Sequence, residues 1–243
     1  MLRLTMLGAL ALESDRGSLA GAALRRRPLA LLALVATAPH GVTRDKLLAY
    51  FWPESDTAHA RNCLNQTLFA LRRDVGEPLF RPAGCSIRLN PEVIDTDRWT
   101  FERSLDCGAL QEAIEAYGGP FLDGFHVGEL VEFERWVETE RRRMGDRYER
   151  ALQALEAVAE RSGDRVTALH WWRLLAEHDP LSSRIAAELV RALLAVGDRA
   201  EAVGTADAHR RLLQSELGAL PVTGEFRSFE RLWCELRGIS AAS

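Results

Sequence analysis

The sequence has few cysteines and no long apolar run, and both absences narrow the class of protein. Its four cysteines, Cys63, Cys85, Cys107 and Cys234, are far apart and lack the paired spacing of a metal site. They are typical of reduced thiols in a cytosolic protein. The longest apolar run, at residues 28–38, falls short of the roughly 18 residues that a membrane-spanning helix needs. We therefore expect a cytoplasmic protein that uses neither a metal nor a membrane.

Sequence motifs for catalysis are also missing. The six histidines are scattered, and none has the HExxH spacing of a metalloprotease. No recognisable Ser/His/Asp or Cys/His motif occurs, and the GxxxxGK[S/T] loop that cradles nucleotide phosphates is absent. The sequence therefore gives no indication of a bound cofactor. An enzyme acting on a small molecule is an alternative that no motif supports.

Charge is distributed unevenly along the 243 residues, whose net charge is −4. Residues 1–97 hold 12 Lys/Arg and 10 Asp/Glu, a net charge of +2. Residues 98–243 hold 19 and 25, a net charge of −6. The pattern of the sequence also changes near residue 97, from mixed strands and helices to helices alone. We expect two domains, 1–97 and 98–243, of which only the first is suited to meet phosphate.

The segment 57–76, TAHARNCLNQTLFALRRDVG, predicts a helix with two distinct faces at about 100° per residue. Ser55 or Asp56 is placed to cap it. One arc is apolar and would face the core: Ala60, Leu64, Thr67, Leu68, Leu71 and Val75. The other arc contains no acidic residue: Arg61, Asn62, Asn65, Gln66, Arg72 and Arg73, with Phe69 in its middle.

The second arc carries the side chains that read base edges in DNA. Arginine pairs with guanine, and asparagine and glutamine pair with adenine, so the segment is a candidate recognition helix. The base-contacting residues that we predict are Arg61, Asn62, Asn65, Gln66 and Phe69. The alternative is an ordinary amphipathic surface helix. Phe69 itself has two interpretations, contact with a thymine methyl or sugar, and packing on a hairpin at the rim of the core.

The sequence around this segment predicts the rest of a winged helix-turn-helix. Alternating apolar residues predict one or two short strands in residues 2–12, and residues 18–23 are a further candidate strand. Two short helices are expected at residues 29–38 and 44–51, the second capped by Thr43. In this fold the third helix enters the major groove.

A β-hairpin expected over residues 79–89, with a Pro-Ala-Gly turn at 82–84, supplies the wing. Phosphate contacts would supply much of the affinity for DNA and make it depend on salt. The phosphate-contacting residues that we predict are Arg44, Lys46, Arg72, Arg73, Arg81 and Arg88. For each alone, a solvated surface cation is the alternative. The arginine run at residues 25–27 could also reach phosphate, or could cover the domain junction.

Residues 98–243 predict helical repeats. The tripeptide Gly-Asp-Arg occurs at residues 163–165 and again at 197–199, a separation of about 34 residues, which is the tetratricopeptide period. Each copy is followed by a small residue for helix packing, Ala168 in the first and Ala202 in the second.

Two longer helices frame these repeats, one starting near Glu129 and one over residues 223–236. Three tryptophans in this part of the chain, Trp136, Trp171 and Trp172, are expected to pack between helices. Because Trp171 and Trp172 are adjacent, both cannot face one helix seam, so one of them could border a groove.

Further motifs occur in a fixed order: WPE at 52–54, DTDRW at 95–99, GPFLDGF at 119–125, FERW at 133–136 and DPL at 179–181. With the helix at 57–73, they resemble the SARP-type regulators. Those are bacterial transcriptional activators with an OmpR-like winged helix followed by a bacterial transcriptional activator domain of tetratricopeptide-like helices. The resemblance covers residues 2–236. It implies a mainly α fold and sequence-specific binding to double-stranded promoter DNA, often as a homodimer on direct repeats, with activation through RNA polymerase.

No receiver-domain segment precedes the winged helix, so phosphoacceptor control within this chain is not expected. The leading hypothesis is a DNA-binding activator that uses the helix at 57–75 and the wing at 79–89. The alternative is a tetratricopeptide-type interaction scaffold whose N-terminal domain binds protein instead of DNA.

Overall fold

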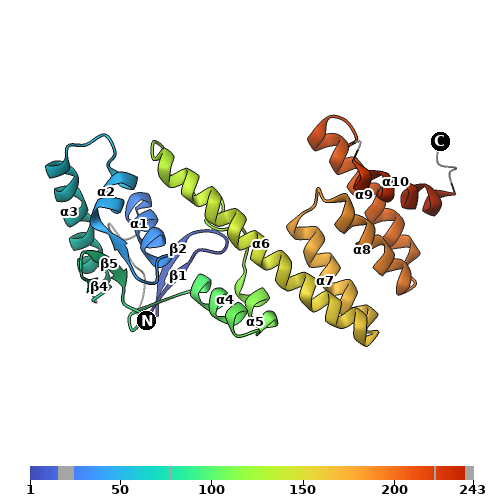
Figure 1. Cartoon of the computed structure of the whole chain (residues 1–243), viewed down its shortest axis with the longest axis horizontal. Coiled ribbons are helices and arrows are strands. Elements are labelled where there is room, and N and C mark those ends of the chain that lie inside the picture. The colour runs from blue at the N-terminus through green and yellow to red at the C-terminus, as the bar shows by residue number, and fades with distance from the viewer. Residues whose placement is uncertain (16–24, 77, 222, 239–243) are drawn as a thin grey trace. The chain divides into compact units, whose positions relative to one another are not determined.

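The computed structural model describes residues 1–15, 25–76, 78–221 and 223–238 of the chain. They form two compact units, Met1–Asp146 and Arg147–Ser243 (Figure 1). Helices make up most of both units, and the small strands belong to the first. None of the helices in the described ranges is both long and apolar enough to cross a membrane. The predicted fold class, a winged helix-turn-helix followed by an all-α repeat domain, is confirmed.

A three-stranded sheet opens the first unit. Its strands are β1 Leu2–Thr5, β2 Ala11–Ser14 and β6 Ile94–Thr96, in the order β2-β1-β6. β1 pairs antiparallel with β2 and parallel with β6, so two segments about 90 residues apart in the chain lie side by side. Leu2 and Leu4 are buried, as their alternation predicted. The further strand expected at residues 18–23 lies outside the described residues.

Three helices build the helix-turn-helix: α1 Arg26–Ala36, α2 Arg44–Phe51 and α3 Thr57–Val75. Side-chain caps fix where two of them begin. Thr43 accepts a hydrogen bond from the Lys46 N–H at 3.3 Å, and Asp56 accepts one from the His59 N–H at 3.0 Å. α3 ends where Gly76 takes the left-handed conformation, with φ of 69°. Both predicted caps are therefore confirmed, with Asp56 as the cap of α3.

The wing is an antiparallel hairpin of β4 (Phe80–Ala83) and β5 (Ser86–Leu89), and β3 (Val42–Thr43) extends it to a sheet of order β3-β5-β4. Its turn is Gly84-Cys85, because the ladder stays paired up to the residues on either side. The hairpin is confirmed, but the predicted turn at 82–84 is placed too early. Gly84 has φ of 61°, which a glycine adopts without strain and which a tight hairpin turn requires.

The DTDRW segment joins the N-terminal strands and α1 to the helices that follow. Asp97 accepts hydrogen bonds from the N–H groups of Met6 and Leu7 at 2.8–2.9 Å. Burial raises the pKa of Asp97 above its usual range, although these hydrogen bonds act in the opposite direction. The Trp99 indole N–H donates to the carbonyl of Ala36 at the end of α1, at 2.8 Å. The motif is thus a structural junction inside the first unit.

Arg98 forms a buried ion-pair network between α4 (Asp97–Asp106) and α6 (Val131–Ser162). Its side chain is 1% exposed and pairs with Glu102 and Glu140, each at 3.1 Å. Burial lowers the pKa of the Arg98 guanidinium, and the two carboxylates raise it. A charge removed so far from water needs both partners, so this network fixes α4 against the first half of α6.

The loop between α5 (Leu110–Ala116) and α6 contains the GPFLDGF motif and returns to the segment that follows β1. Phe121 forms an antiparallel bridge with Leu7. Arg141 of α6 donates to the carbonyls of Phe121 and Leu122, at 3.2 and 3.1 Å. These contacts place the first half of α6 in the first compact unit, so the units divide within α6. The domain boundary drawn after residue 97 on the sequence stays a prediction.

The second unit contains the last turns of α6 and a series of helices packed side by side: α7 Arg165–His178, α8 Ser183–Ala195, α9 Arg199–Leu217 and α10 Gly224–Arg237. The predicted repeat has a physical basis. Gly163 and Gly197 both take left-handed φ values, 74° and 89°. Asp164 and Asp198 then cap α7 and α9 by accepting the N–H three residues further on.

The tryptophans divide between core and cavity. Trp171 is buried, whereas Trp172 is half-buried and lines a cavity described below. The prediction that one of the pair borders a groove is confirmed. Trp136 is half-buried in the first unit, with its ring edge-on to Phe121 at 5.6 Å.

Candidate nucleic-acid interface

The polar face of α3 is exposed, and its apolar face lies in the core. Arg61, Asn62, Asn65 and Gln66 are all exposed. The buried residues of α3 are Ala60, Leu64, Leu68 and Leu71. The other two members of the predicted apolar stripe, Thr67 and Val75, are half-buried. α3 therefore presents four of its five predicted base-contacting side chains, the polar ones, to solvent on one continuous face.

Arg44 connects the start of α2 to this face. Its Nη1 donates a hydrogen bond to Asn65 Oδ1 at 2.9 Å. The pairing joins a predicted phosphate contact to a predicted base contact, and it fixes which end of the Asn65 amide points away from Arg44. Sequence reasoning placed both residues in the interface but did not foresee this contact, because they are 21 positions apart.

A surface hollow of about 630 Å³ lies beside this pair. It is lined by the end of β3, by α2 and α3, and by the turn of the wing: Thr43, Arg44, Asp45, Arg61, Leu64, Asn65 and Cys85. Asp45 and Cys85 were not among the predicted site residues. Asp45 lies in the first turn of α2, where a carboxylate stabilises the helix N-terminus, and it introduces one negative charge at the edge of the hollow.

Phe69 is 66% exposed, on the solvent side of α3. The interpretation that it packs at the rim of the core is therefore wrong. The hairpin supplies its own apolar residues to the core, including Phe80 and Ile87. A large exposed aromatic side chain on this face is suited to apolar contact with a base or sugar.

The two arginines at the end of α3 already have partners within the unit. The Arg72 guanidinium lies over the ring of Phe80, 5.7 Å from its centroid. Arg73 pairs with the adjacent Asp74 at 2.7 Å. Both arginines remain exposed, and their location at the end of α3 suits backbone contact more than base reading.

The wing places two arginines on one face. Arg81 and Arg88 are direct cross-strand partners, and like charges in this arrangement repel each other. Arg81 is half-buried and pairs with Glu92, whose pKa is lowered by the hydrogen bond and the charge of Arg81. Arg88 is exposed. The wing therefore presents one partly neutralised arginine and one open arginine.

Lys46 is exposed in the first turn of α2, and its ammonium group lies 5.8 Å from the centroid of the Tyr50 ring. The arginine run at residues 25–27 contacts other parts of the first unit instead. Arg26 donates to the carbonyl of His126 at 3.1 Å, and the Arg27 guanidinium lies 5.8 Å from the Trp52 ring centroid. These contacts favour the interpretation that the run covers a junction.

Comparison with solved structures supports this architecture. The chain is similar to Mycobacterium tuberculosis EmbR in complex with a low affinity phosphopeptide, with a TM-score of 0.59 at 18% sequence identity. The alignment covers 99% of this chain and 66% of that one, so the chain spans about two thirds of that structure's length. At this identity the likeness shows the fold. Among curated proteins, none matches the chain.

The architecture is a winged helix-turn-helix followed by helical repeats. The sequence model of the bacterial transcriptional activator domain matches residues 100–231. The chain belongs to this family. Its resemblance to the SARP-type regulators is thereby confirmed.

Proposed function

We propose that the protein binds promoter DNA in a sequence-specific manner, with α3 in the major groove and the wing against the DNA backbone. The observation that carries this proposal is the face of α3. Arg61, Asn62, Asn65 and Gln66 are exposed together, without an acidic residue among them, on the third helix of a winged helix-turn-helix.

Cations around this face would contact phosphate. Lys46 and Arg44 lie at the start of α2, and Arg88 is open on the wing. The repulsion between Arg81 and Arg88 would be relieved by a phosphate between them, which gives the wing a reason to hold two arginines on one face. Arg72 and Arg73 would assist from the end of α3.

The way in which DNA binding would lead to activation follows from the family. We expect the protein to act as an activator in the bacterial cytoplasm, to contact RNA polymerase through its helical repeats, and to bind direct repeats as a pair of molecules. The acidic second half of the sequence is suited to a protein partner more than to DNA.

The test is DNA binding by the full chain, measured by fluorescence anisotropy on fragments recovered by binding-site selection. Affinity should fall as salt rises, with a negative slope in a plot of log affinity against log salt. Arg61→Glu should abolish the preference for selected fragments. Arg227→Glu is the matched control, since it reverses an exposed arginine on α10. Absence of binding at low salt, or an Arg61→Glu variant that binds normally, would favour the scaffold alternative.

Lys46 provides an independent readout, because it is the only lysine in the sequence. Bound DNA should protect its ammonium group from an amine-reactive reagent, and labelling of the peptide that contains Lys46 can be followed by mass spectrometry. Equal labelling with and without a saturating amount of a selected DNA fragment would show that Lys46, at the start of α2, does not contact DNA.

A further inference from the structure

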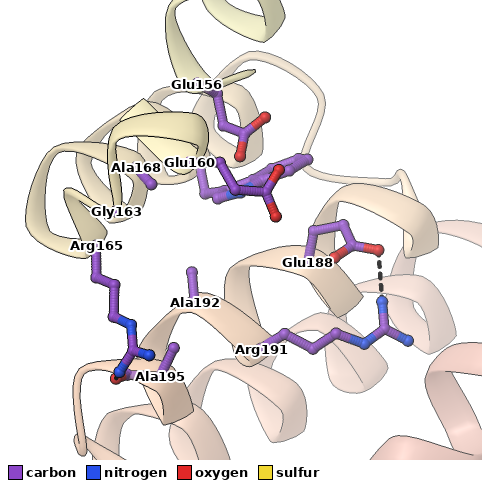
Figure 2. Close-up of a pocket in the computed structure, with 10 residues that line it drawn as sticks. Glu156, Glu160, Gly163, Arg165, Ala168, Glu188, Arg191, Ala192 and Ala195 are labelled. Carbon is purple, nitrogen blue, oxygen red and sulfur yellow. Dashed lines mark hydrogen bonds and ion pairs between the residues drawn. The ribbon is translucent and has the colours of Figure 1, made fainter. Parts of the chain in front are cut away.

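The second unit contains a cavity of about 400 Å³ between α6, α7 and α8. Its volume lies within the range of small-ligand sites, about 300–1,000 Å³. Figure 2 shows Glu156 and Glu160 extending toward it from α6, and Glu188 from α8. The half-buried indole of Trp172 lines the cavity as well. The lining thus combines an aromatic wall with three carboxylates.

Two arginines also line this cavity, and one of them is paired with a carboxylate. Arg191 donates to Glu188 one turn before it on α8, at 2.5 Å (Figure 2). Arg165 donates to the carbonyl of Ala195 at the end of α8, at 3.1 Å. In the described part of the chain, no ion pair joins Glu156 or Glu160 to a cation. Glu156 is half-buried and Glu160 is exposed, and the lining as a whole holds three carboxylates against two guanidinium groups.

The surroundings of Glu156 disfavour the charged form of its carboxyl group. Burial raises the pKa of the Glu156 carboxyl, and the charges of Glu160 and Glu188 raise it further. The Trp172 side chain donates a hydrogen bond to Glu156 and acts in the opposite direction. The indole ring packs against the buried residues of the second unit, so it is held in place as one wall of the cavity.

We propose that this cavity binds an organic cation, a primary ammonium or guanidinium group carried on a short alkyl chain. The cationic group would lie between Glu156 and Glu160. Its methylene groups would lie against Trp172, where an alkyl cation gains both apolar contact and cation–π attraction. The methyl groups of Ala168 and Ala192 complete the apolar lining.

A metal ion does not fit the same residues. Across the described ranges, no set of three or more His, Cys, Asp and Glu side chains converges closely enough to hold one. An ammonium or guanidinium group has N–H donors on several sides, so it can donate hydrogen bonds to carboxylates that are too far apart to coordinate one metal ion. Its alkyl chain can at the same time reach the Trp172 ring. The proposal concerns the second unit alone and does not depend on DNA binding.

An alkyl cation of this kind could come from a free amine or from a basic side chain of a partner protein. Calorimetric titration of the full chain distinguishes these two sources. The probes are agmatine, putrescine and a capped tripeptide with a central arginine, Ac-Gly-Arg-Gly-NH₂. Saturable binding of the free amines with no binding of the capped peptide identifies a small-molecule effector site. Tighter binding of the peptide identifies a basic segment of a partner. If none of the three probes saturates the protein at concentrations up to about 10 mM, which is weaker than specific binding, the proposal is overturned.

Variants locate the site. Glu156→Gln and Glu160→Gln should each lower the affinity for the tightest-binding probe by at least about tenfold, since each removes a negative charge that faces the cation. Glu216→Gln is the matched control, because it removes an exposed carboxylate from α9 outside the cavity. Folding is monitored by melting of the ligand-free protein. Relief of repulsion predicts that Glu156→Gln melts at the same temperature or higher. Undiminished binding in both cavity variants refutes the site.

Discussion

Arg44 donates a hydrogen bond to Asn65 Oδ1 at 2.9 Å, and this contact changes what Asn65 can read. An asparagine that recognises adenine accepts from the base N6 amino group through Oδ1 and donates to N7 through Nδ2. Because Arg44 occupies one of the two lone pairs of Oδ1, the Nδ2 group is the part of the amide that is wholly free to meet a base. Asn65 should therefore favour acceptor groups such as guanine N7 and O6, whereas asparagine chemistry alone predicts adenine.

The first prediction concerns this specificity. Arg44→Ala should release Oδ1 and raise the frequency of adenine at the base pair that Asn65 contacts, measured by binding-site selection on the wild type and the variant. Asn65→Ala should remove the preference at the same base pair, where a good bidentate contact discriminates by about 1–3 kcal/mol. Identical selected sequences for the wild type and Arg44→Ala would show that the hydrogen bond does not direct recognition.

The second prediction separates the two wing arginines. Arg88→Ala should weaken binding to selected and random DNA alike, and should reduce the slope of log affinity against log salt by about 0.9, as loss of one phosphate contact does. Arg81→Ala should reduce the slope by less, because Glu92 already neutralises part of its charge. A loss confined to selected DNA for Arg88→Ala would instead assign this residue to base reading.

The third prediction concerns Phe69. Because its ring is 66% exposed, Phe69→Ala should leave the free energy of unfolding within about 0.5 kcal/mol of the wild type, yet lower affinity for selected DNA. Phe133→Ala is the stability contrast. Phe133 is fully buried against Phe51, and such a truncation costs about 3–5 kcal/mol. Chemical denaturation and anisotropy measure the two properties, and a destabilised Phe69→Ala would mean that the ring has a packing role.

Local signals in the sequence predicted much of this fold. The cap at Thr43 and the two Gly-Asp starts of α7 and α9 depend on residues within three or four positions of each other, so they are visible in the sequence. The two faces of α3 follow from its periodicity. The sequence places the hairpin turn too early because proline is common in turns, whereas Pro82 is paired with Ile87 inside β4.

Contacts between distant residues could not be predicted in this way. Asp97 accepts from Met6 about 90 positions away, and Arg98 finds Glu140 about 40 positions away. The partner of Arg81 is Glu92, across the end of the hairpin. A sequence shows which side chains are able to pair, and the packing of the chain decides which of them meet. The candidate site was therefore predicted as a set of residues, without the hydrogen bonds that orient them.

The fourth prediction tests the buried network of the first unit. Glu140→Gln removes one carboxylate from the buried Arg98, and breaking a buried pair costs up to about 3–5 kcal/mol. Glu138→Gln is the control on the same helix. Its pairs with Arg141 and Arg142 are solvent-exposed and are expected to contribute at most about 1 kcal/mol. Urea denaturation compares the two, and equal stabilities would mean that Glu102 alone satisfies Arg98.

The last prediction concerns pH and His209. This side chain is buried in the second unit, with Nδ1 at 3.1 Å from the Pro180 carbonyl and Nε2 at 3.1 Å from the Ser183 hydroxyl. A carbonyl only accepts, so Nδ1 carries the proton and Nε2 of the neutral ring accepts from Ser183. Burial lowers the pKa of His209 below its usual range, while the Pro180 carbonyl and Asp179 act in the opposite direction.

The sign of the pH effect follows from which state binds the proton. In the unfolded chain His209 has a pKa of about 6.5, so below that pH it takes up a proton that the buried ring of the folded protein resists. The stability that the neutral ring contributes is therefore present above about pH 6.5 and is lost as the pH falls below it. The urea midpoint should therefore fall between about pH 7.5 and pH 5.5. His209→Gln should weaken this dependence, and His170→Gln, which removes an exposed imidazole from α7, controls for the loss of one histidine. If the His209→Gln and His170→Gln variants show the same pH dependence as the wild type, the buried ring does not control acid stability.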